Sequence, residues 1–262
     1  MSARIGVVFR PDFRPDTLRQ TAAAAEHAGV TELWLWEDCF LQGGIAQAAV
    51  ALASSETLTV GLGVLPAPLR NVVTTAMEIA TLESMFPGRI RVGLGHGVQD
   101  WMRQAGAAVA SPLTLMREYV TALKDLLAGR TVTVDGRYVR LADVCLDWAP
   151  QQRVPVLIGA TGPKTLALAG ETADGVILDS QYTVTTLRDP LGHVASGRAA
   201  RGGTPFSTVL FLACGADQAA VSVGPYLEAG VDTLVFQPVG AQAVMPELIT
   251  AAGEVAARLR AG

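Results

Sequence analysis

The stretch TVGLGVLPAPLRNVVTTAMEIATLESMFPGRIRVGLGHG, residues 59–97, decides the fold. Its first residues form an apolar run that predicts a strand, and residues 71–85 predict a long amphipathic helix. Pro87-Gly88 then turns the chain into a second apolar run. A strand, a helix and a second strand in this order predict a right-handed unit with two parallel strands.

The same alternation continues in both directions from this unit. Strands are predicted at residues 4–9, 32–36, 58–65, 89–94, 154–158, 175–178, 206–213 and 232–236. Helices are predicted behind them at about residues 15–28, 45–54, 71–85, 112–128, 163–171, 183–201, 217–229 and 243–259.

Eight strand–helix repeats in 262 residues predict a closed (β/α)₈ TIM barrel, with residues 1–262 forming a single domain. The strands are apolar on both faces, which suits a parallel sheet that is buried on both sides. A small β-hairpin insertion is expected where TVTVD and RYVRL flank the turn Asp135-Gly136. An open, doubly wound sheet is the alternative architecture.

The composition excludes several classes of protein. Half of the residues are apolar and the net charge is −4, which argues against a nucleic-acid-binding protein. The N-terminus lacks the apolar segment of a signal peptide, and no uncharged stretch is long enough to span a membrane. The three cysteines, Cys39, Cys145 and Cys214, are too dispersed for a disulfide framework. We therefore expect a cytoplasmic protein that acts on a small-molecule substrate and binds neither nucleic acid nor membrane.

The sequence lacks the motifs that are typical of metal sites and of many hydrolases. His27, His96 and His193 are dispersed, and neither an HxH nor an HExxH pattern occurs, so we expect no metal site. The G-x-S-x-G motif of many hydrolases is also absent. A lyase or aldolase needs a catalytic lysine at a strand end, but Lys124 and Lys164 both fall in predicted helices.

In a barrel of this type the functional groups lie at the C-terminal ends of the strands. Gly159 to Thr165, GATGPKT, follows one such strand and precedes a helix. Its glycines allow close approach of a ligand, Thr161 can cap the helix, and Pro163 suits its first position. Exposed N–H groups and Lys164 would then favour an anion, although an ordinary strand-to-helix turn explains the same residues.

A second glycine-rich segment, Gly93-Leu-Gly95-His-Gly97, ends the strand at residues 89–94. It lacks the full G-x-G-x-x-G spacing, so it is either a surface for a flat ring or simply a tight turn. His96 lies at the height in the barrel where catalytic groups gather, which favours a functional role.

Acidic and aromatic residues surround the strand at residues 32–36. Glu37 and Asp38 follow it and are candidates for ligand contacts or acid–base catalysis, unless Asp38 caps the next helix. Trp34 and Trp36 fall inside the strand and are interpreted as packing residues, whereas Trp101, in a loop, is a candidate for the pocket.

Segments 59–97 and 154–178 resemble the luciferase-like monooxygenase superfamily. In the first, a strand ending in a glycine and small apolar residues leads to an arginine-containing loop, a long helix, G-R and a G-x-G strand end. In the second, VPVLIGATGPKTLALAGETADGVIL, the GPK-x-L-x-LAGE-x-ADGVI pattern is especially similar to the deazaflavin-using branch, which includes methylenetetrahydromethanopterin reductases. With EAGVDTLVFQP at residues 228–238, the resemblance extends over most of the chain.

The resemblance implies a hydride-transferring oxidoreductase that binds the deazaflavin F420, or alternatively FMN, at the mouth of the barrel. The cofactor ring would lie over the ends of the strands at residues 58–65 and 89–94, with a non-prolyl cis peptide behind it at Gly63–Val64. The residues implied in cofactor binding are Gly63, Val64, Gly93, Gly95, Gly159, Ala160, Thr161, Gly162, Pro163 and Lys164.

Two departures from the family's pattern affect the site. Several deazaflavin enzymes carry an Asp-His pair where this chain has Asp38-Cys39, which argues against a dehydrogenase that depends on that histidine. Only residues 215–231 separate the last two strands, where relatives carry a longer helical insertion. We expect Asp38, Cys39 and His96 to line the reaction pocket.

The remaining alternatives are an FMN-dependent monooxygenase that uses reduced flavin and oxygen, and a non-catalytic flavin-binding protein. A homodimer is also expected, because the helices at residues 45–54 and 72–85 carry small and apolar residues on more than one face. The alternative is a monomer whose small residues allow close packing of its helices against its own sheet.

Overall fold

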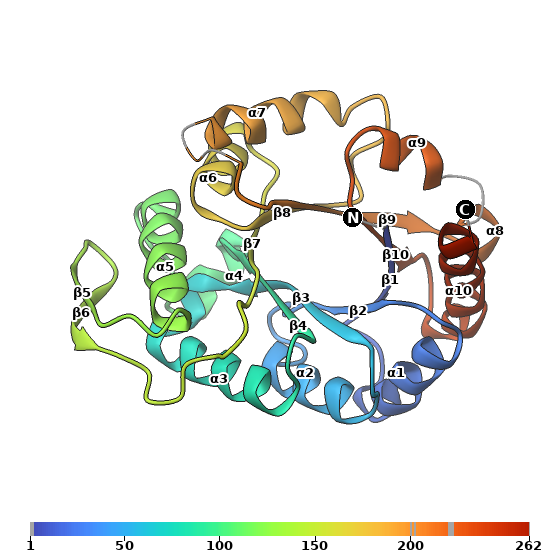
Figure 1. The fold of residues 1–262 in the computed structure, drawn as a ribbon, viewed down its shortest axis with the longest axis horizontal. Coiled ribbons are helices and arrows are strands. Elements are labelled where there is room, and N and C mark those ends of the chain that lie inside the picture. The colour runs from blue at the N-terminus through green and yellow to red at the C-terminus, as the bar shows by residue number, and fades with distance from the viewer. Residues whose placement is uncertain (1–2, 200, 202, 220–222, 262) are drawn as a thin grey trace.

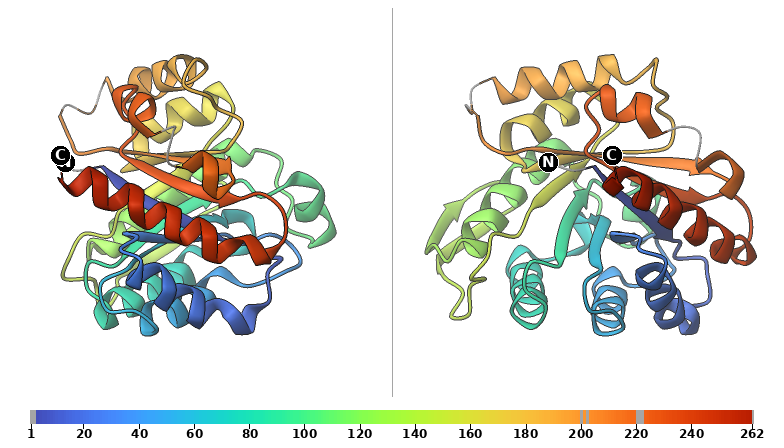
Figure 2. Two further views of the ribbon diagram at one scale, coloured as in Figure 1. Left: turned by 90° about the vertical axis from the view of Figure 1, so that its right-hand side faces the viewer. Right: turned by 45° about the vertical axis from the view of Figure 1, so that its right-hand side comes forward.

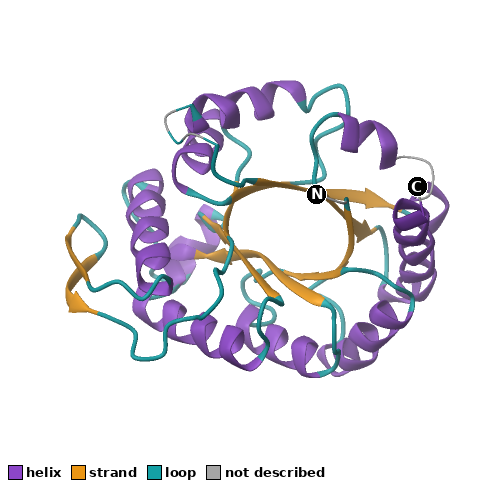
Figure 3. Ribbon diagram, in the orientation of Figure 1, coloured by secondary structure: helices purple, strands orange, loops and turns teal. Residues whose placement is uncertain are grey.

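Eight parallel strands form a closed ring at the centre of the molecule, and helices surround it (Figures 1 and 3). The computed structural model describes residues 3–199, 201, 203–219 and 223–261. Around the ring the strands follow the order β1, β10, β9, β8, β7, β4, β3, β2. Their bounds are β1 Arg4–Phe9, β2 Glu32–Leu35, β3 Thr59–Pro66, β4 Ile90–Gly95, β7 Val156–Gly159, β8 Gly175–Leu178, β9 Ser207–Cys214 and β10 Thr233–Pro238. The predicted (β/α)₈ barrel is confirmed.

The longer helices lie on the outside of this ring, where each buries an apolar stripe against the strands. Figure 2 shows α10 running along the outer surface beside α1. The longer helices are α1 Leu18–His27, α2 Gly44–Ala53, α3 Val72–Met85, α5 Pro112–Leu127, α6 Pro163–Thr172, α7 Arg188–Arg198 and α10 Met245–Ala261. Short helices are α4 Gln99–Gln104, α8 Ala216–Ala219 and α9 Val223–Glu228. No helix in the described ranges is long and apolar enough to cross a membrane.

Side chains fill the interior of the ring. Trp34 is fully buried there and packs edge-to-face on Phe211, with the ring centroids 5.6 Å apart. A Cβ atom on Gly61 or Gly63 would overlap the Trp34 indole, so glycine on β3 is what allows the indole to lie across that strand. The interior is therefore a packed core, and the space for a ligand lies above it.

A buried ion pair closes the N-terminal end of the barrel. Arg91, on β4, donates to Glu32 on β2 over 2.8 Å, and the two side chains are 5% and 1% exposed. Arg91 also donates to Ser207 on β9 and Thr233 on β10, so a single guanidinium joins four strands. This network lies at the end of the barrel where residues generally serve stability.

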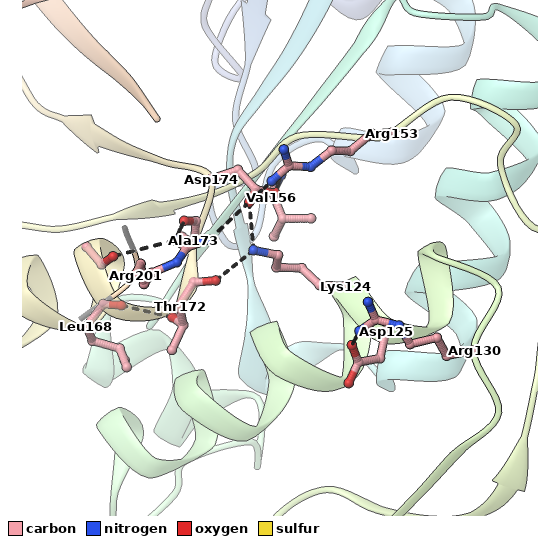
Figure 4. A network of polar contacts seen from close by, with 11 residues as sticks. Lys124, Asp125, Arg130, Arg153, Val156, Leu168, Thr172, Ala173, Asp174 and Arg201 are labelled. Carbon is pink, nitrogen blue, oxygen red and sulfur yellow. Dashed lines mark hydrogen bonds and ion pairs between the residues drawn. The ribbon is translucent and has the colours of Figure 1, made fainter. Parts of the chain in front are cut away.

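Asp174 organises a second polar cluster at the same end, just before β8 (Figure 4). Its carboxylate accepts from Lys124 of α5 over 2.6 Å and from Arg153 over 2.5 Å. It also accepts from the backbone N–H of Val156 over 3.1 Å. The cluster ties α5 and the start of β7 to the start of β8.

The predicted hairpin is present and projects outside α5 (Figure 1), with strands β5 Val132–Asp135 and β6 Arg140–Val144. Its second strand begins later than the RYVRL pattern predicts. The Glu118 carboxylate accepts the backbone N–H groups of residues 137–139 and so holds them in a turn.

Two predicted helices differ in the structure, and one short helix was not predicted. The helix predicted from residue 183 begins only at Arg188, because Thr183 and Thr186 hydrogen-bond to each other in a preceding turn. The helix predicted at residues 217–229 is seen as α8 and α9, and residues 220–222 between them lie outside the described residues. Helix α4 was not predicted at all.

Candidate active site

A cavity of about 530 Å³ opens at the C-terminal ends of the barrel strands, the end where ligands bind in this architecture. This volume is within the range of small-molecule sites. Residues from the ends of β2, β3, β4, β7, β8, β9 and β10 line it.

The floor of the cavity is flat and apolar. The Gly63–Val64 peptide bond at the end of β3 is cis, as the resemblance implies. The Val64 side chain lies against Gly95 and Gly159, and a Cβ atom on either glycine would overlap it. Gly93 does not line the cavity, because Ile177 and Leu62 enclose the position of a Cβ at that residue.

His96 forms one wall, immediately after β4. Its Nε2 is hydrogen-bonded to Oγ1 of Thr165, 3.0 Å away in the first turn of α6. Its Nδ1 is buried and has no hydrogen-bond partner among the described residues. Burial lowers the pKa of the imidazole, with the backbone of Pro112 opposing the shift. Burial therefore favours the neutral form of the ring, and the buried Nδ1 is not exposed to the cavity.

Asp38 also lines the cavity, on the loop after β2, and its carboxylate has no ion pair within the described part of the chain. Burial raises the pKa of this carboxyl. The Trp36 indole N–H opposes the shift without reaching hydrogen-bond geometry, and the charge of Asp12 reinforces it. An unpaired, half-buried carboxylate of this kind is suited to binding a cation or transferring a proton.

Cys39 lies beside this wall but is not among the residues that line the cavity. The following Cys39–Phe40 peptide bond is also cis, which the sequence did not indicate. Burial, together with the charges of Glu37 and Asp38, raises the pKa of the thiol. The thiol is therefore not activated as a nucleophile.

Glu37, rather than Asp38, anchors the start of α2, so the capping role considered for Asp38 is wrong. Its Oε2 accepts from the backbone N–H of Gly44 over 2.7 Å and from Arg70 over 2.6 Å. Arg70 donates in turn to Glu78 on α3 over 3.0 Å, and its Nε is buried without a partner. The negative charge of Glu37 is thus neutralised behind the cavity wall.

The turn GATGPKT, residues 159–165, connects the cavity to the first turn of α6. Gly159, Ala160, Thr161 and Thr165 line the cavity, whereas residues 162–164 lie at its edge. Pro163 occupies the first turn as predicted, but Gly162 is the N-cap and no side chain caps the helix, so the capping role suggested for Thr161 is wrong. Lys164 is exposed.

The wall opposite the glycine floor contains residues that the sequence reading missed or misplaced. Trp36 was interpreted as a packing residue inside a strand, but β2 ends at Leu35 and the indole faces the cavity. Phe211 of β9 packs against it with ring centroids 5.8 Å apart. Gln237 of β10 and Asp179, after β8, complete this side, and Trp101 on α4 lines the cavity as expected.

The comparison with known proteins identifies the family to which this geometry belongs. The model of the family described as luciferase-like monooxygenase matches residues 3–229. The chain belongs to this family.

Two curated relatives and one solved structure illustrate the similarity. A 5,10-methylenetetrahydromethanopterin reductase from Methanolobus tindarius is 30% identical over 177 residues, covering 68% of this chain and 54% of the relative. An F420-dependent glucose-6-phosphate dehydrogenase from Microbacterium testaceum is 31% identical over 192 residues, covering 68% and 55%. The chain spans about half the length of these relatives.

The solved structure of an F420-dependent secondary alcohol dehydrogenase, in complex with an F420–acetone adduct, superposes with a TM-score of 0.86 and 18% identity. The alignment covers 97% of this chain and 98% of the other. At this level of identity the match supports the fold.

Among the described residues, no group of three or more His, Cys, Asp or Glu side chains could hold a metal ion.

Proposed function

We propose that this protein is an F420-dependent oxidoreductase that transfers a hydride between the deazaflavin and a small organic substrate. The observation that carries the proposal is the flat floor formed by Val64, Gly95 and Gly159, which lies next to the uncapped start of α6. Curated relatives named as F420-dependent enzymes support the choice of cofactor.

The residues present fit such a cofactor. Glycine at positions 95 and 159 makes room for the Val64 side chain, which a Cβ atom at either position would overlap, and these three residues give a ring an apolar surface at the cavity. The first turn of α6 has no side-chain cap, so its N–H groups and its dipole are available to a phosphate at Thr161 and Gly162. Lys164, exposed beside this turn, would add a positive charge.

When bound, the deazaflavin supplies the two-electron redox chemistry, and the protein supplies orientation and a shaped cavity. We propose that His96 acts on the substrate from the cavity wall, either accepting a proton or orienting a hydroxyl. Thr165 holds the imidazole by its Nε2 and so fixes the orientation of the ring. Asp38 faces the same space from β2, and Cys39 takes the place beside it that a histidine has in several deazaflavin enzymes.

FMN is the alternative cofactor, and an FMN-dependent monooxygenase the alternative activity. The two are separated by titrating the apo-protein with F420 and with FMN, and by measuring oxygen consumption with each reduced cofactor. Binding of F420 together with substrate turnover and little oxygen consumption is the expected result. Binding of FMN alone, or oxygen consumption coupled to turnover, would replace the proposal by the alternative.

We also propose that the protein is a cytoplasmic homodimer. The outer face of α3 and the loop behind it expose Met77, Met85 and Trp148, which are 56%, 66% and 85% exposed. Met77, Met85 and Trp148 line a groove of about 440 Å³. An apolar patch of this kind on a globular protein commonly binds another protein surface, and we assign it to a second copy of the chain.

A further inference from the structure

Among the described residues, the cavity is lined by three carboxylates and by one basic side chain, the imidazole of His96, whose pKa is lowered by burial. Glu37, Asp38 and Asp179 line it, and no Lys or Arg is among the described residues that do so. Arg70 neutralises Glu37 from behind the wall. Within the described ranges Asp38 has no ion pair, and the Asp179 side chain accepts only the backbone N–H of Gln181, over 3.1 Å. Two uncompensated carboxylates therefore face the cavity.

These two carboxylates lie on opposite sides of the barrel mouth. Asp38 follows β2 and Asp179 follows β8, and β2 and β8 are separated around the ring by β1, β10 and β9. The flat glycine floor lies on the other arc, at the ends of β3, β4 and β7. A substrate seated beside a ring on that floor would thus lie along the arc bounded by the two carboxylates.

Aromatic rings form the wall between them. Trp36 and Phe211 pack together at 5.8 Å between centroids, and both line the cavity. Trp101, on α4 after β4, lines the cavity on the arc of the glycine floor. The faces of aromatic rings, tryptophan above all, attract cations and apolar groups but offer nothing to a phosphate or carboxylate. The carboxylates and the aromatic rings on this arc therefore both favour a cationic ligand that carries an apolar group.

We infer that the substrate is an organic cation, a protonated amine or an iminium ion carrying an apolar group, whose charged nitrogen pairs with Asp38. This inference rests on the proposed function and specifies its substrate class. It distinguishes the chain from its relative named for glucose 6-phosphate, because a substrate phosphate on the arc between Asp38 and Asp179 would meet two carboxylates and, among the described lining residues, no Lys or Arg.

The corresponding reaction is reduction of a C=N⁺ bond at the expense of reduced F420. The iminium carbon gains a hydride, the C–N π electrons become the nitrogen lone pair and take up the one proton released, and the products are the ammonium ion and oxidised F420. In the reverse reaction an amine is oxidised to the iminium ion and F420 is reduced.

The test is a binding measurement on the apo-protein, which needs no turnover. Benzylammonium, benzyl alcohol and benzoate have the same ring and differ in charge, and their binding is followed by calorimetry. Wild type is expected to bind benzylammonium at least about tenfold more tightly than benzyl alcohol and benzoate least of all, as one charge-assisted contact would give. Asp38→Asn should remove the preference. Asp135→Asn, which removes an exposed carboxylate on the hairpin, should keep it.

Equal affinity for the amine and the alcohol, no measurable binding of the amine, or a preference for benzoate would overturn the inference. F420 binding is measured on the same samples, so the two proposals fail separately. F420 binding without a preference for the cation refutes the substrate class alone. A preference for the cation without F420 binding refutes the proposed function and the reaction written here.

Discussion

The imidazole of His96 and the hydroxyl of Thr165 are hydrogen-bonded at 3.0 Å, although 69 residues separate them in the chain. The bond joins the end of β4 to the first turn of α6, so one contact links the wall of the reaction cavity to the proposed phosphate site. The bond also fixes the orientation of the imidazole in the cavity wall.

Replacing His96 by alanine should reduce kcat about 100-fold or more and change F420 affinity only a few-fold. The reason is that the imidazole is proposed to handle a proton or orient substrate rather than to hold the cofactor. Steady-state kinetics and an F420 titration measure the two effects. His193→Ala, on the exposed side of α7, is the matched control and should leave both unchanged. A His96→Ala protein with full kcat would remove His96 from the mechanism.

His96 should also make stability depend on pH. Burial holds its folded pKa below the ordinary value of 6.5, so as the pH falls the unfolded chain takes up the proton first. The free energy of unfolding is therefore expected to decrease as the pH falls below 6.5, and His96→Gln should decrease less over the same interval. Urea unfolding at about one pH unit above and one below that value measures the difference. Identical changes in wild type and variant would contradict a lowered pKa.

The buried ion pair of Arg91 and Glu32, at the N-terminal end of the barrel, should contribute to stability and not to cofactor binding. Arg91→Met removes the buried partner of the Glu32 carboxylate and leaves it only the half-exposed Arg4 and the Trp34 indole N–H among the described residues, so it should reduce the free energy of unfolding by about 3–5 kcal/mol. Arg4→Met removes a second, half-exposed partner of Glu32 and should cost less than about 1 kcal/mol. If Arg91→Met remains folded, its F420 affinity should equal that of wild type, because the pair lies beneath the packed core. A loss of F420 affinity in the folded variant would show that the two ends are coupled.

The proposed dimer is tested at the exposed face of α3. Light scattering at micromolar concentration should give about twice the chain mass of 27.3 kDa. Met77→Asp should shift the mass toward that of one chain, because it puts a charge into the apolar groove. Val184→Asp, at another exposed apolar position, should not. A wild-type mass of one chain would refute the dimer.

The barrel could be predicted from sequence because its signal is local and repeated. Each apolar run of four to eight residues followed by an amphipathic stretch predicts its own strand and helix. The hairpin followed from the Asp135-Gly136 turn, but its second strand was misplaced because the controlling contact comes from Glu118, about twenty residues earlier. A local sequence pattern does not reveal a contact between residues that lie so far apart in the chain.

The site was predictable only where family motifs mark it. Gly63, Val64, Gly95 and Gly159 lie at the cavity as expected, and so do Asp38 and His96. Trp36 was misplaced because the pattern WLW, residues 34–36, predicts one continuous strand. In the structure β2 ends at Leu35, so Trp36 is no longer paired with the neighbouring strand. Phe211 was missed because β9 is largely apolar, so its sequence does not tell which side chains point into the barrel.

The central claim is that the cofactor is F420 and that it rests against Val64 and the start of α6. Its most direct test is the F420 dissociation constant of wild type compared with Gly162→Val, with Gly192→Val on α7 as control. A Cβ atom at either position meets no described neighbour within 4 Å, so both variants should fold. We expect saturable F420 binding by wild type and the control, and binding at least about tenfold weaker in Gly162→Val. Unchanged F420 affinity in a folded Gly162→Val protein, or no F420 binding by wild type, would contradict the account.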